Sequence, residues 1–284
     1  MDLKRDLAVW EDYELLDSGD RMKCERFGAV TVTRPEPQAL WSPASPDVWR
    51  KSVARFSQQG EDGTWQVKAE LPSEWTVRWE NLRFGLRLSS FKHTGVFPEQ
   101  AANWRYLREQ VSTGDRVLNL FGYTGGATLA ALSVGAEVVH VDASRPAIAA
   151  AKFNAELSGF SNRPVRWLED DAVKFVEREA RRERSYDCII MDPPAFGRGP
   201  NKELWRFESD LLPLLLACRK ILSPGGRLLV NAYSMGFPAV VIEQTVRTAF
   251  PTAKKIDSVE LVLSEKSARG FVLPAGITVR AVID

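Results

Sequence analysis

Short apolar runs alternate with segments of helical periodicity from residue 116 onward. The apolar runs predict strands over 116–121, 136–141, 165–169, 186–191 and 226–232. The segments between them predict helices over 126–133, 145–158, 172–183 and 203–221. Strict alternation with short loops is typical of a parallel sheet that carries helices on both faces.

The segments that flank this alternation complete the predicted domain. A helix is expected over 98–111, ahead of the first strand, and another near 237–250. Strands near 256–263 and 277–283 follow with nothing helical between them, which indicates an antiparallel hairpin at one sheet edge. We therefore predict an α/β fold with a doubly wound, mainly parallel, seven-stranded sheet.

Residues 1–92 show a different pattern, with short β-type runs separated by breakers. Strands are expected over 22–27, 29–33, 64–71 and 75–79, and in the alternation of Phe84, Leu86 and Leu88. This favours a small, mainly antiparallel β-domain at 1–92, with a role in substrate recognition, ahead of the larger domain at 93–284.

Six of the nine tryptophans lie in this front region, interleaved with basic residues. Aromatic rings stack on unpaired bases and arginines hold phosphates, so an RNA-facing surface is one interpretation. The other is that these tryptophans form the core of a small domain.

Composition restricts the class of protein further. The net charge is +1, so any nucleic acid or membrane partner would need a local patch. Three cysteines without a C-x-x-C pair and only two histidines argue against a zinc site, and we expect no metal. No run approaches the roughly 18 apolar residues of a membrane span, and the charged start is unlike a signal peptide. We expect a cytoplasmic protein without a membrane partner; the oligomeric state is not readable.

The break after the first predicted strand is rich in glycine and is followed at once by a helix. Residues 121–126 read Phe-Gly-Tyr-Thr-Gly-Gly. Glycine permits positive φ and close approach of a ligand, and a helix N-terminus attracts polar or anionic groups. The alternative is an ordinary strand-to-helix turn without a ligand.

Acidic residues at the ends of the next strands favour the ligand interpretation. Asp142 stands 20 residues after Gly122, where nucleotide-binding folds place a carboxylate on ribose hydroxyls. The glycines do not form G-x-G-x-x-G, so a nucleoside cofactor without phosphates, such as S-adenosylmethionine (SAM), fits better. Asp170 and Asp171 follow the third strand; one is expected to cap a helix, and Asp171 is our choice to accept the adenine amino group.

The fourth strand ends in Asp192-Pro193-Pro194-Ala195-Phe196. Two prolines remove backbone donors and stiffen the segment, which leaves carbonyls aimed outward. An aspartate oxygen beside such a carbonyl makes a clamp of two acceptors for an amino group, and Phe196 offers a face for a planar base.

These motifs resemble those of class I SAM-dependent methyltransferases, and within them the bacterial 23S rRNA base methyltransferases that carry a D-P-P-x-F motif. The stretch from Trp79 to Gln100 also resembles that family's segment ahead of the SAM domain, so the resemblance covers about 79–284.

The resemblance implies SAM as cofactor, ribosomal RNA as partner and three sets of site residues. The catalytic set is Asp192, Pro193, Pro194 and Phe196. The cofactor-binding set is Thr94, Phe97, Phe121, Gly122, Tyr123, Thr124, Gly125, Gly126, Asp142, Ala143, Asp171, Ala172 and Asp192. The substrate-binding set is Tyr233, Arg198, Lys202 and Arg269.

The chemistry expected is direct methyl transfer to a base nitrogen. Methylation at cytosine C5 needs a cysteine thiolate to activate the ring. Relatives that perform it carry this cysteine after the fifth strand, where Tyr233 stands here. Cys188 precedes Asp192 by four residues, roughly 13 Å along the strand at ~3.3 Å per residue.

Two other functions remain open from the sequence. One is a methyltransferase for a protein or small-molecule amine or amide, which the near-neutral charge allows. The other is a SAM-binding, RNA-associated module with little catalysis, against which the intact D-P-P-x-F motif argues.

Overall fold

The computed structural model describes residues 4–59, 62–68, 70–89, 92–233 and 236–284. It divides into two compact units. The larger unit comprises residues 4–6, Ala102–Leu261 and Ala275–Asp284, and the smaller unit comprises Leu7–Ala101 and Val262–Pro274. The predicted strand over 64–71 includes residue 69, which lies outside the described residues.

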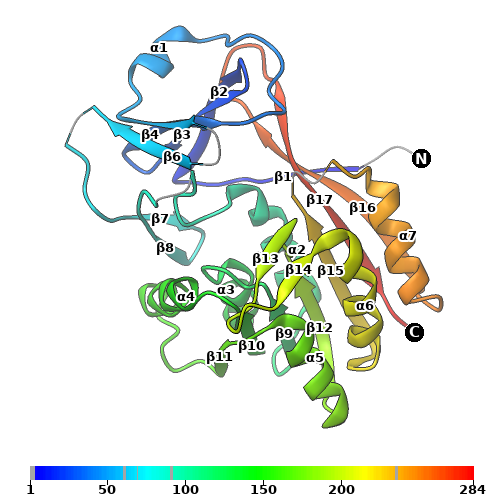
Figure 1. Ribbon diagram of the computed structural model, residues 1–284. Helices are drawn as coiled ribbons and strands as arrows, with labels where there is room; N and C mark the ends of the chain where they lie inside the picture. The colour runs from blue at the N-terminus through cyan, green and yellow to red at the C-terminus, as the bar shows by residue number, and fades with distance from the viewer. Residues whose placement is uncertain (1–3, 60–61, 69, 90–91, 234–235) are drawn as a thin grey trace. The chain divides into compact units, whose positions relative to one another are not determined.

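The main sheet has eight strands within the described part of the chain, in the order β1-β16-β17-β15-β12-β9-β10-β11 (Figure 1). The pairs β9–β10, β10–β11, β9–β12 and β12–β15 are parallel, whereas β15 pairs with β17 antiparallel. The strands are β1 (Lys4–Leu7), β9 (Arg116–Leu120), β10 (Glu137–Asp142), β11 (Val165–Glu169), β12 (Tyr186–Met191), β15 (Leu222–Ala232), β16 (Lys255–Ser264) and β17 (Val272–Val282). The predicted doubly wound, mainly parallel α/β sheet is confirmed.

The prediction of seven strands was one strand short, because β1 adds an edge strand beside β16. Its sequence, Lys-Arg-Asp-Leu, carries no apolar alternation, and most of its side chains are exposed. A short, charged edge strand is held by backbone hydrogen bonds and its position in the fold, so hydrophobic periodicity cannot reveal it.

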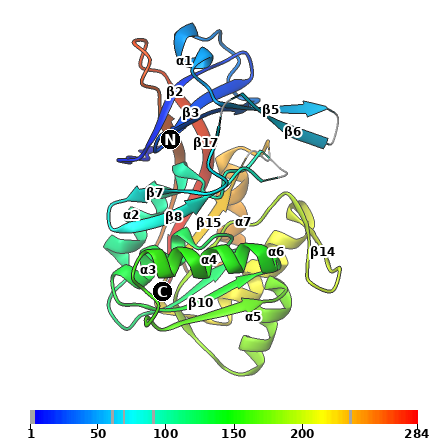
Figure 2. The ribbon, with the colours of Figure 1, turned by 90° about the vertical axis from the view of Figure 1, so that its left-hand side faces the viewer.

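Helices cover both faces of this sheet. α3 and α4 lie on one face, and α5, α6 and α7 lie on the other (Figures 1 and 2). The helices are α2 (Ala101–Gln110), α3 (Gly126–Ser133), α4 (Arg145–Leu157), α5 (Ala172–Arg181), α6 (Phe207–Arg219) and α7 (Ala239–Ala249), with a 3₁₀ turn, η1 (Pro98–Gln100), before α2. The central strands β9 and β12 are buried along almost their whole length, as expected of strands covered from both sides.

The predicted helix over 203–221 was wrong in its first turn. Residues Leu204–Arg206 form β14, which pairs antiparallel with β13 (Phe196–Arg198), and α6 begins at Phe207. Trp205 decides this, because its side chain is buried and its Nε1 donates to Pro194 O over 2.7 Å. A contact between residues 11 apart therefore overrides the local preference for helix.

The smaller unit is rich in strands. It contains a five-stranded sheet in the order β2-β3-β4-β5-β6 and the hairpin β7–β8. The elements are β2 (Tyr13–Gly19), β3 (Met22–Phe27), β4 (Val30–Pro35), α1 (Pro46–Arg50), β5 (Ala54–Gln59), β6 (Asp62–Val67), β7 (Trp75–Trp79) and β8 (Leu82–Leu86). The predicted β-rich character of this region is confirmed, although β2, β5 and α1 were not predicted.

The tryptophans of this unit are bound into its own structure. Several donate their indole N–H groups to protein acceptors, and these are Trp10, Trp41, Trp49, Trp65 and Trp79. Trp79 is also almost fully buried. These contacts favour the interpretation as a domain core over an RNA-stacking surface.

Candidate functional site

The loop after β9 adopts a conformation that residues other than glycine rarely take. Phe121 and Tyr123 have φ of 56° and 48°, and Gly125, which caps α3, has φ of 88°. Such backbone costs on the order of 1–3 kcal/mol per residue and clusters at ligand sites. The Gly122 N–H donates to Val141 O over 3.0 Å, so a hydrogen bond joins the loop to the end of β10.

Two glycines of this loop are also required by the side chains packed behind them. A Cβ on Gly122 would lie 2.4 Å from the His140 ring, and one on Gly126 would lie 2.2 Å from the Trp104 ring. Both rings are buried. The sequence explained these glycines by a ligand in front of the loop, and the structure adds a packing reason from behind it.

The N-terminus of α3 carries no capping side chain, because Gly125 is its N-cap. The first N–H groups of a helix have no partner within the helix, and the helix dipole adds partial positive charge there. This end of α3 therefore fits the polar part of a cofactor.

Asp142 ends β10 and braces the loop. Its Oδ2 accepts the Tyr123 N–H over 2.8 Å, and its Oδ1 accepts the Ser144 N–H over 2.7 Å. Burial raises the pKa of Asp142, while the hydrogen bonds from backbone N–H groups, including that of Ala143, lower it. Each carboxylate oxygen has a second lone pair, so the group retains acceptor capacity for ribose hydroxyls.

The acidic pair after β11 is engaged in local structure. Asp171 caps α5, where its Oδ1 accepts the Lys174 N–H over 2.9 Å. Asp170 forms an ion pair with Arg178. The expected helix cap is therefore Asp171, and its contact with adenine, like that of the buried Ala172 beside it, stays a prediction.

Asp192 follows β12 directly and lies beside β15. Its Oδ1 accepts the Asn231 Nδ2–H over 2.6 Å. Although part of its surface stays accessible, the surrounding protein desolvates the carboxylate and raises its pKa to about 6, against the lowering effect of the Asn231 bond. A carboxylate that is desolvated yet ionised at neutral pH is a strong acceptor for a substrate donor.

The carbonyls of the double-proline segment differ in their partners. Pro194 O accepts from Trp205 Nε1, and Ala195 O accepts the Phe207 N–H over 3.0 Å. Within the described residues no donor contacts Pro193 O. Asp192 and Pro193 are thus adjacent acceptors on a segment that Trp205 holds in place.

The β13–β14 hairpin continues from this segment and presents apolar and basic side chains. Phe196 is 55% exposed and Leu204 is 48% exposed. Arg198 and Lys202 are exposed as well, and the structure records no ion pair for either within the described residues. The buried Trp205 anchors the hairpin against Phe121, with ring centroids 5.0 Å apart.

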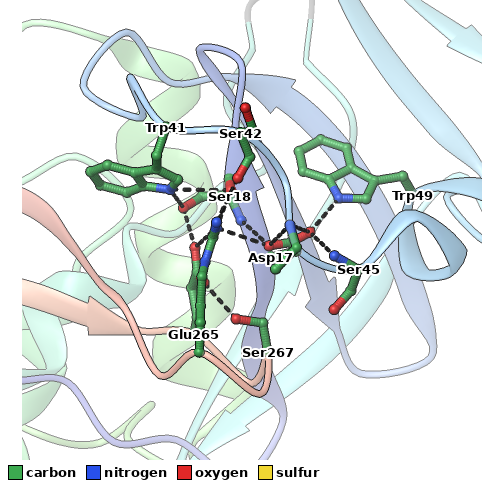
Figure 3. Close-up of polar contacts among 10 residues, drawn as sticks. Asp17, Ser18, Trp41, Ser42, Ser45, Trp49, Glu265 and Ser267 are labelled. Carbon is green, nitrogen blue, oxygen red and sulfur yellow. Dashed lines mark hydrogen bonds and ion pairs between the residues drawn. The ribbon is translucent and has the colours of Figure 1, made fainter.

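Arg269 lies in the smaller unit, where its guanidinium contacts several acceptors. The residues that supply them, Asp17, Ser18, Ser42 and Glu265, lie close together in Figure 3. It pairs with Glu265 at 2.9 Å and with Asp17 at 3.1 Å, and it donates to the carbonyls of Ser18 and Ser42. Because these partners occupy the guanidinium, we do not carry Arg269 into the proposed substrate site.

Three further predicted residues have no established role in this structure. Thr94 and Phe97 belong to the smaller unit; Thr94 is buried, and the Phe97 ring lies 5.1 Å from the His93 ring. Tyr233 is half-buried and follows β15. Their contacts with cofactor or substrate stay predictions.

Sequence reasoning missed two residues that shape the site, Asn231 and Trp205. Asn231 is a buried amide in the otherwise apolar end of β15. A polar residue in a buried strand must find a partner, and that signal was present in the sequence. The contact of Trp205 depends on a hairpin that was predicted as helix, so no local signal indicated it.

Cys24, Cys188 and Cys218 are free and buried, and burial raises the pKa of each thiol, to about 12 for Cys24 and Cys188. No group of three or more potential ligands in the described residues could hold a metal ion. None of the helices in the described ranges combines the length and hydrophobicity of a membrane-spanning helix.

Comparison with known proteins identifies the family of this chain. Residues 45–263 match the family model of S-adenosylmethionine-dependent methyltransferases. The crystal structure of the SAM-dependent methyltransferase from Agrobacterium tumefaciens is 38% identical, with a TM-score of 0.93 over 100% of this chain and 96% of that chain.

Two relatives carry more specific names. The ribosomal RNA large subunit methyltransferase K/L of Shewanella sp. (strain W3-18-1) is 30% identical over 242 residues, which are 84% of this chain and 33% of that protein. The ribosomal RNA large subunit methyltransferase I of Aeromonas salmonicida (strain A449) is 28% identical over 249 residues, which are 82% of this chain and 60% of that protein. This chain thus spans only part of the length of either relative. By the family model and the Agrobacterium structure, the chain belongs to the SAM-dependent methyltransferase family and is an enzyme that uses S-adenosylmethionine as its cofactor.

Proposed function

We propose that this enzyme methylates a nitrogen of a base in ribosomal RNA, by direct transfer from SAM. Two acceptors carry the proposal, namely the Asp192 carboxylate held by Asn231 and the neighbouring Pro193 carbonyl, which no described donor contacts. The names of the relatives, which are ribosomal RNA methyltransferases, support the choice of substrate. An RNA of the ribosome as substrate implies a cytoplasmic location.

The loop at residues 121–126, Asp142 and the uncapped start of α3 would hold the cofactor. The residues present fit such a group, because Asp142 retains lone pairs and the first N–H groups of α3 lack a capping side chain. SAM supplies an electrophilic methyl group and its own leaving group, so the protein contributes position and electrostatics.

Asp192 and Pro193 would orient an amino nitrogen of the base. When both N–H bonds of the amino group point at these acceptors, the nitrogen lone pair is directed away from them. Since the pKa of Asp192 is about 6, the carboxylate is ionised at neutral pH and can take the proton that the nitrogen releases after it gains the methyl group.

Transfer to nitrogen is favoured over cysteine-assisted C5 methylation by the environment of the thiols. A nucleophilic cysteine needs a lowered pKa and access to the ring. All three cysteines are buried, and the pKa of each is raised.

The β13–β14 hairpin would contact the RNA. Phe196 follows Asp192 by four residues and is 55% exposed, so it can stack on a base that has left its helix. Arg198 and Lys202, without ion pairs in the described residues, would contact phosphates.

Mass spectrometry of ribosomal RNA nucleosides tests the proposal. We expect one methylated nucleoside to disappear in a strain that lacks the gene, to return with the wild-type gene and to stay absent with Asp192→Ala. An unchanged nucleoside profile in all three strains would exclude the ribosomal RNA substrate, and a labelled protein or small molecule would then identify the amine alternative.

A further inference from the structure

A continuous chain of hydrogen bonds leads from Asp192 into the interior of the larger unit. Asn231 Nδ2 donates to Asp192 Oδ1 over 2.6 Å, and Thr278 Oγ1 donates to Asn231 Oδ1 over 2.8 Å. Asn103 Nδ2 donates to Thr278 Oγ1 over 2.9 Å. Arg280 Nη2 donates to Asn103 Oδ1 over 2.9 Å. We call Asn231, Thr278, Asn103 and Arg280 the donor chain.

Three secondary structure elements build the donor chain. Asn231 and Thr278 are directly opposite one another in the antiparallel pair of β15 and β17, which lie next to each other in Figure 1. Asn103 comes from α2. All three side chains are buried, with 0–2% exposure. Buried polar groups of this kind are retained only when each finds a partner, and here each partner is supplied by a different element.

The direction of every bond follows from the cation at the far end. A guanidinium can only donate, so Arg280 fixes the oxygen of Asn103 toward itself and the NH₂ group of Asn103 toward Thr278. The Thr278 oxygen accepts that bond, and its single proton goes to Asn231 Oδ1. Asn231 must then direct its NH₂ group at Asp192, and a flipped amide would place two acceptors face to face.

Arg280 is itself held in position. It pairs with Asp6 of β1 at 2.9 Å, and its guanidinium lies 4.3 Å from the centroid of the Tyr106 ring. Its side chain is only 10% exposed. The edge strand β1 therefore supplies the carboxylate that anchors the start of the donor chain.

We propose that Asn231, Thr278 and Asn103 are positioning residues, which hold the Asp192 carboxylate in one rotamer for the substrate. The proposal rests on the role assigned to Asp192 in the proposed function. The bond from Asn231 Nδ2 to Asp192 Oδ1 sets the orientation in which the carboxylate meets the amino group. A carboxylate free to rotate would present the wrong oxygen or the wrong angle, and small displacements of a reacting group cost much rate.

Thr278 gives the sharpest test, because one variant keeps the shape of the side chain and loses the hydroxyl, and another keeps the hydroxyl. Thr278→Val removes the donor to Asn231, whereas Thr278→Ser keeps it. We expect Thr278→Val to lower kcat about tenfold, the cost of losing about one buried hydrogen bond, with KM for SAM unchanged. We expect Thr278→Ser to retain most of the wild-type kcat.

The pH dependence supplies a readout that a loss of stability alone would not move. The Asn231 bond lowers the pKa of Asp192 against the effect of burial. When Asn231 is no longer oriented, this pKa should rise, and the acidic limb of the kcat profile should move to higher pH in Thr278→Val and not in Thr278→Ser. The same rise should be visible without any substrate, by titrating the ¹³C-labelled Asp192 carboxyl in NMR spectra assigned with Asp192→Asn.

The two proposals fail in different ways. Full activity of Asp192→Ala would remove the role of Asp192 and with it the proposed function. The other outcome is that Asp192→Ala is inactive while Thr278→Val keeps the wild-type kcat, the wild-type acidic limb and the wild-type pKa of the Asp192 carboxyl. That outcome would overturn the role of the donor chain alone. If Thr278→Val does not fold, Asn103→Ala carries the same test, since it removes the donor that fixes the Thr278 hydroxyl.

Discussion

Glu25 in the smaller unit and Asp192 in the larger unit are both carboxylates withdrawn from water, but their partners differ. Glu25 accepts from Tyr13 over 2.8 Å and from Arg34 over 2.5 Å, and Lys23 lies 3.7 Å away. Burial would raise the pKa of Glu25, yet the cations lower it to about 2. Asp192 has a neutral amide as donor, and its pKa is raised to about 6.

The difference separates a structural carboxylate from one that is available to a ligand. Glu25 is surrounded by cations and a hydroxyl that compensate its charge. It therefore links β2, β3 and β4 and is not an acceptor for a ligand. Asp192 carries a charge that its own surroundings compensate only in part. A perturbed carboxylate of this kind at the end of a strand is a good candidate for binding chemistry.

The largest effect should come from removing Glu25, the carboxylate whose charge is compensated. Glu25→Ala removes the carboxylate that pairs with the buried Arg34, and we expect a loss of about 3–5 kcal/mol in the free energy of unfolding of the smaller unit. Urea denaturation followed by tryptophan fluorescence measures it, because six of the nine tryptophans lie in residues 1–92. The matched control is Glu14→Ala, which breaks a half-exposed pair with Arg26 and should cost at most about 1 kcal/mol.

Removal of the Asp192 carboxylate should instead act on the reaction. We expect Asp192→Ala to lower kcat/KM by about 10²–10³, because one preorganised contact to the reacting group is lost. SAM affinity, measured by calorimetry, and the urea midpoint should stay close to wild type. If Asp192→Ala lowered the urea midpoint as Glu25→Ala does and left methyl transfer intact, Asp192 would be the structural carboxylate of the two.

The smallest effect is a difference in pH dependence, because activity depends on Asp192 and stability depends on Glu25. Asp192 must be ionised, so activity should fall about tenfold for each pH unit below its pKa of about 6. The lowered pKa of Glu25 contributes stability that is fully present above the ordinary glutamate value of ~4.3 and is lost as the pH falls toward 2. At pH 5 the protein should therefore be folded and nearly tenfold less active. Fluorescence and kcat/KM measured on the same samples check this, and flat activity down to pH 5 would contradict it.

The order of strands and loops was readable from the sequence because it depends on local periodicity. Alternating apolar runs and helical segments predicted a parallel sheet, and parallel strands bring their carboxyl ends to one edge. That rule alone placed the loop at residues 121–126, Asp142 and Asp192 at strand ends. The acidic residues and the Asp-Pro-Pro segment needed no knowledge of distant contacts.

Contacts between residues far apart in sequence were decided by the tertiary structure. Asn231 meets Asp192 because β15 pairs with β12, and it meets Thr278 because β17 returns antiparallel beside β15. Trp205 is drawn into a hairpin by Pro194 O, 11 residues earlier. Arg269 was predicted at the substrate, but Asp17 and Glu265 enclose it.

Sequence by itself therefore determined which chemical groups stand at the ends of the strands, because hydrophobic periodicity and backbone stereochemistry are local. Only the tertiary structure decided which of those groups have their charge compensated by neighbouring side chains. The pKa of a carboxylate and the direction of an amide depend on neighbours that pairing and packing bring from elsewhere in the chain, and no local pattern encodes them.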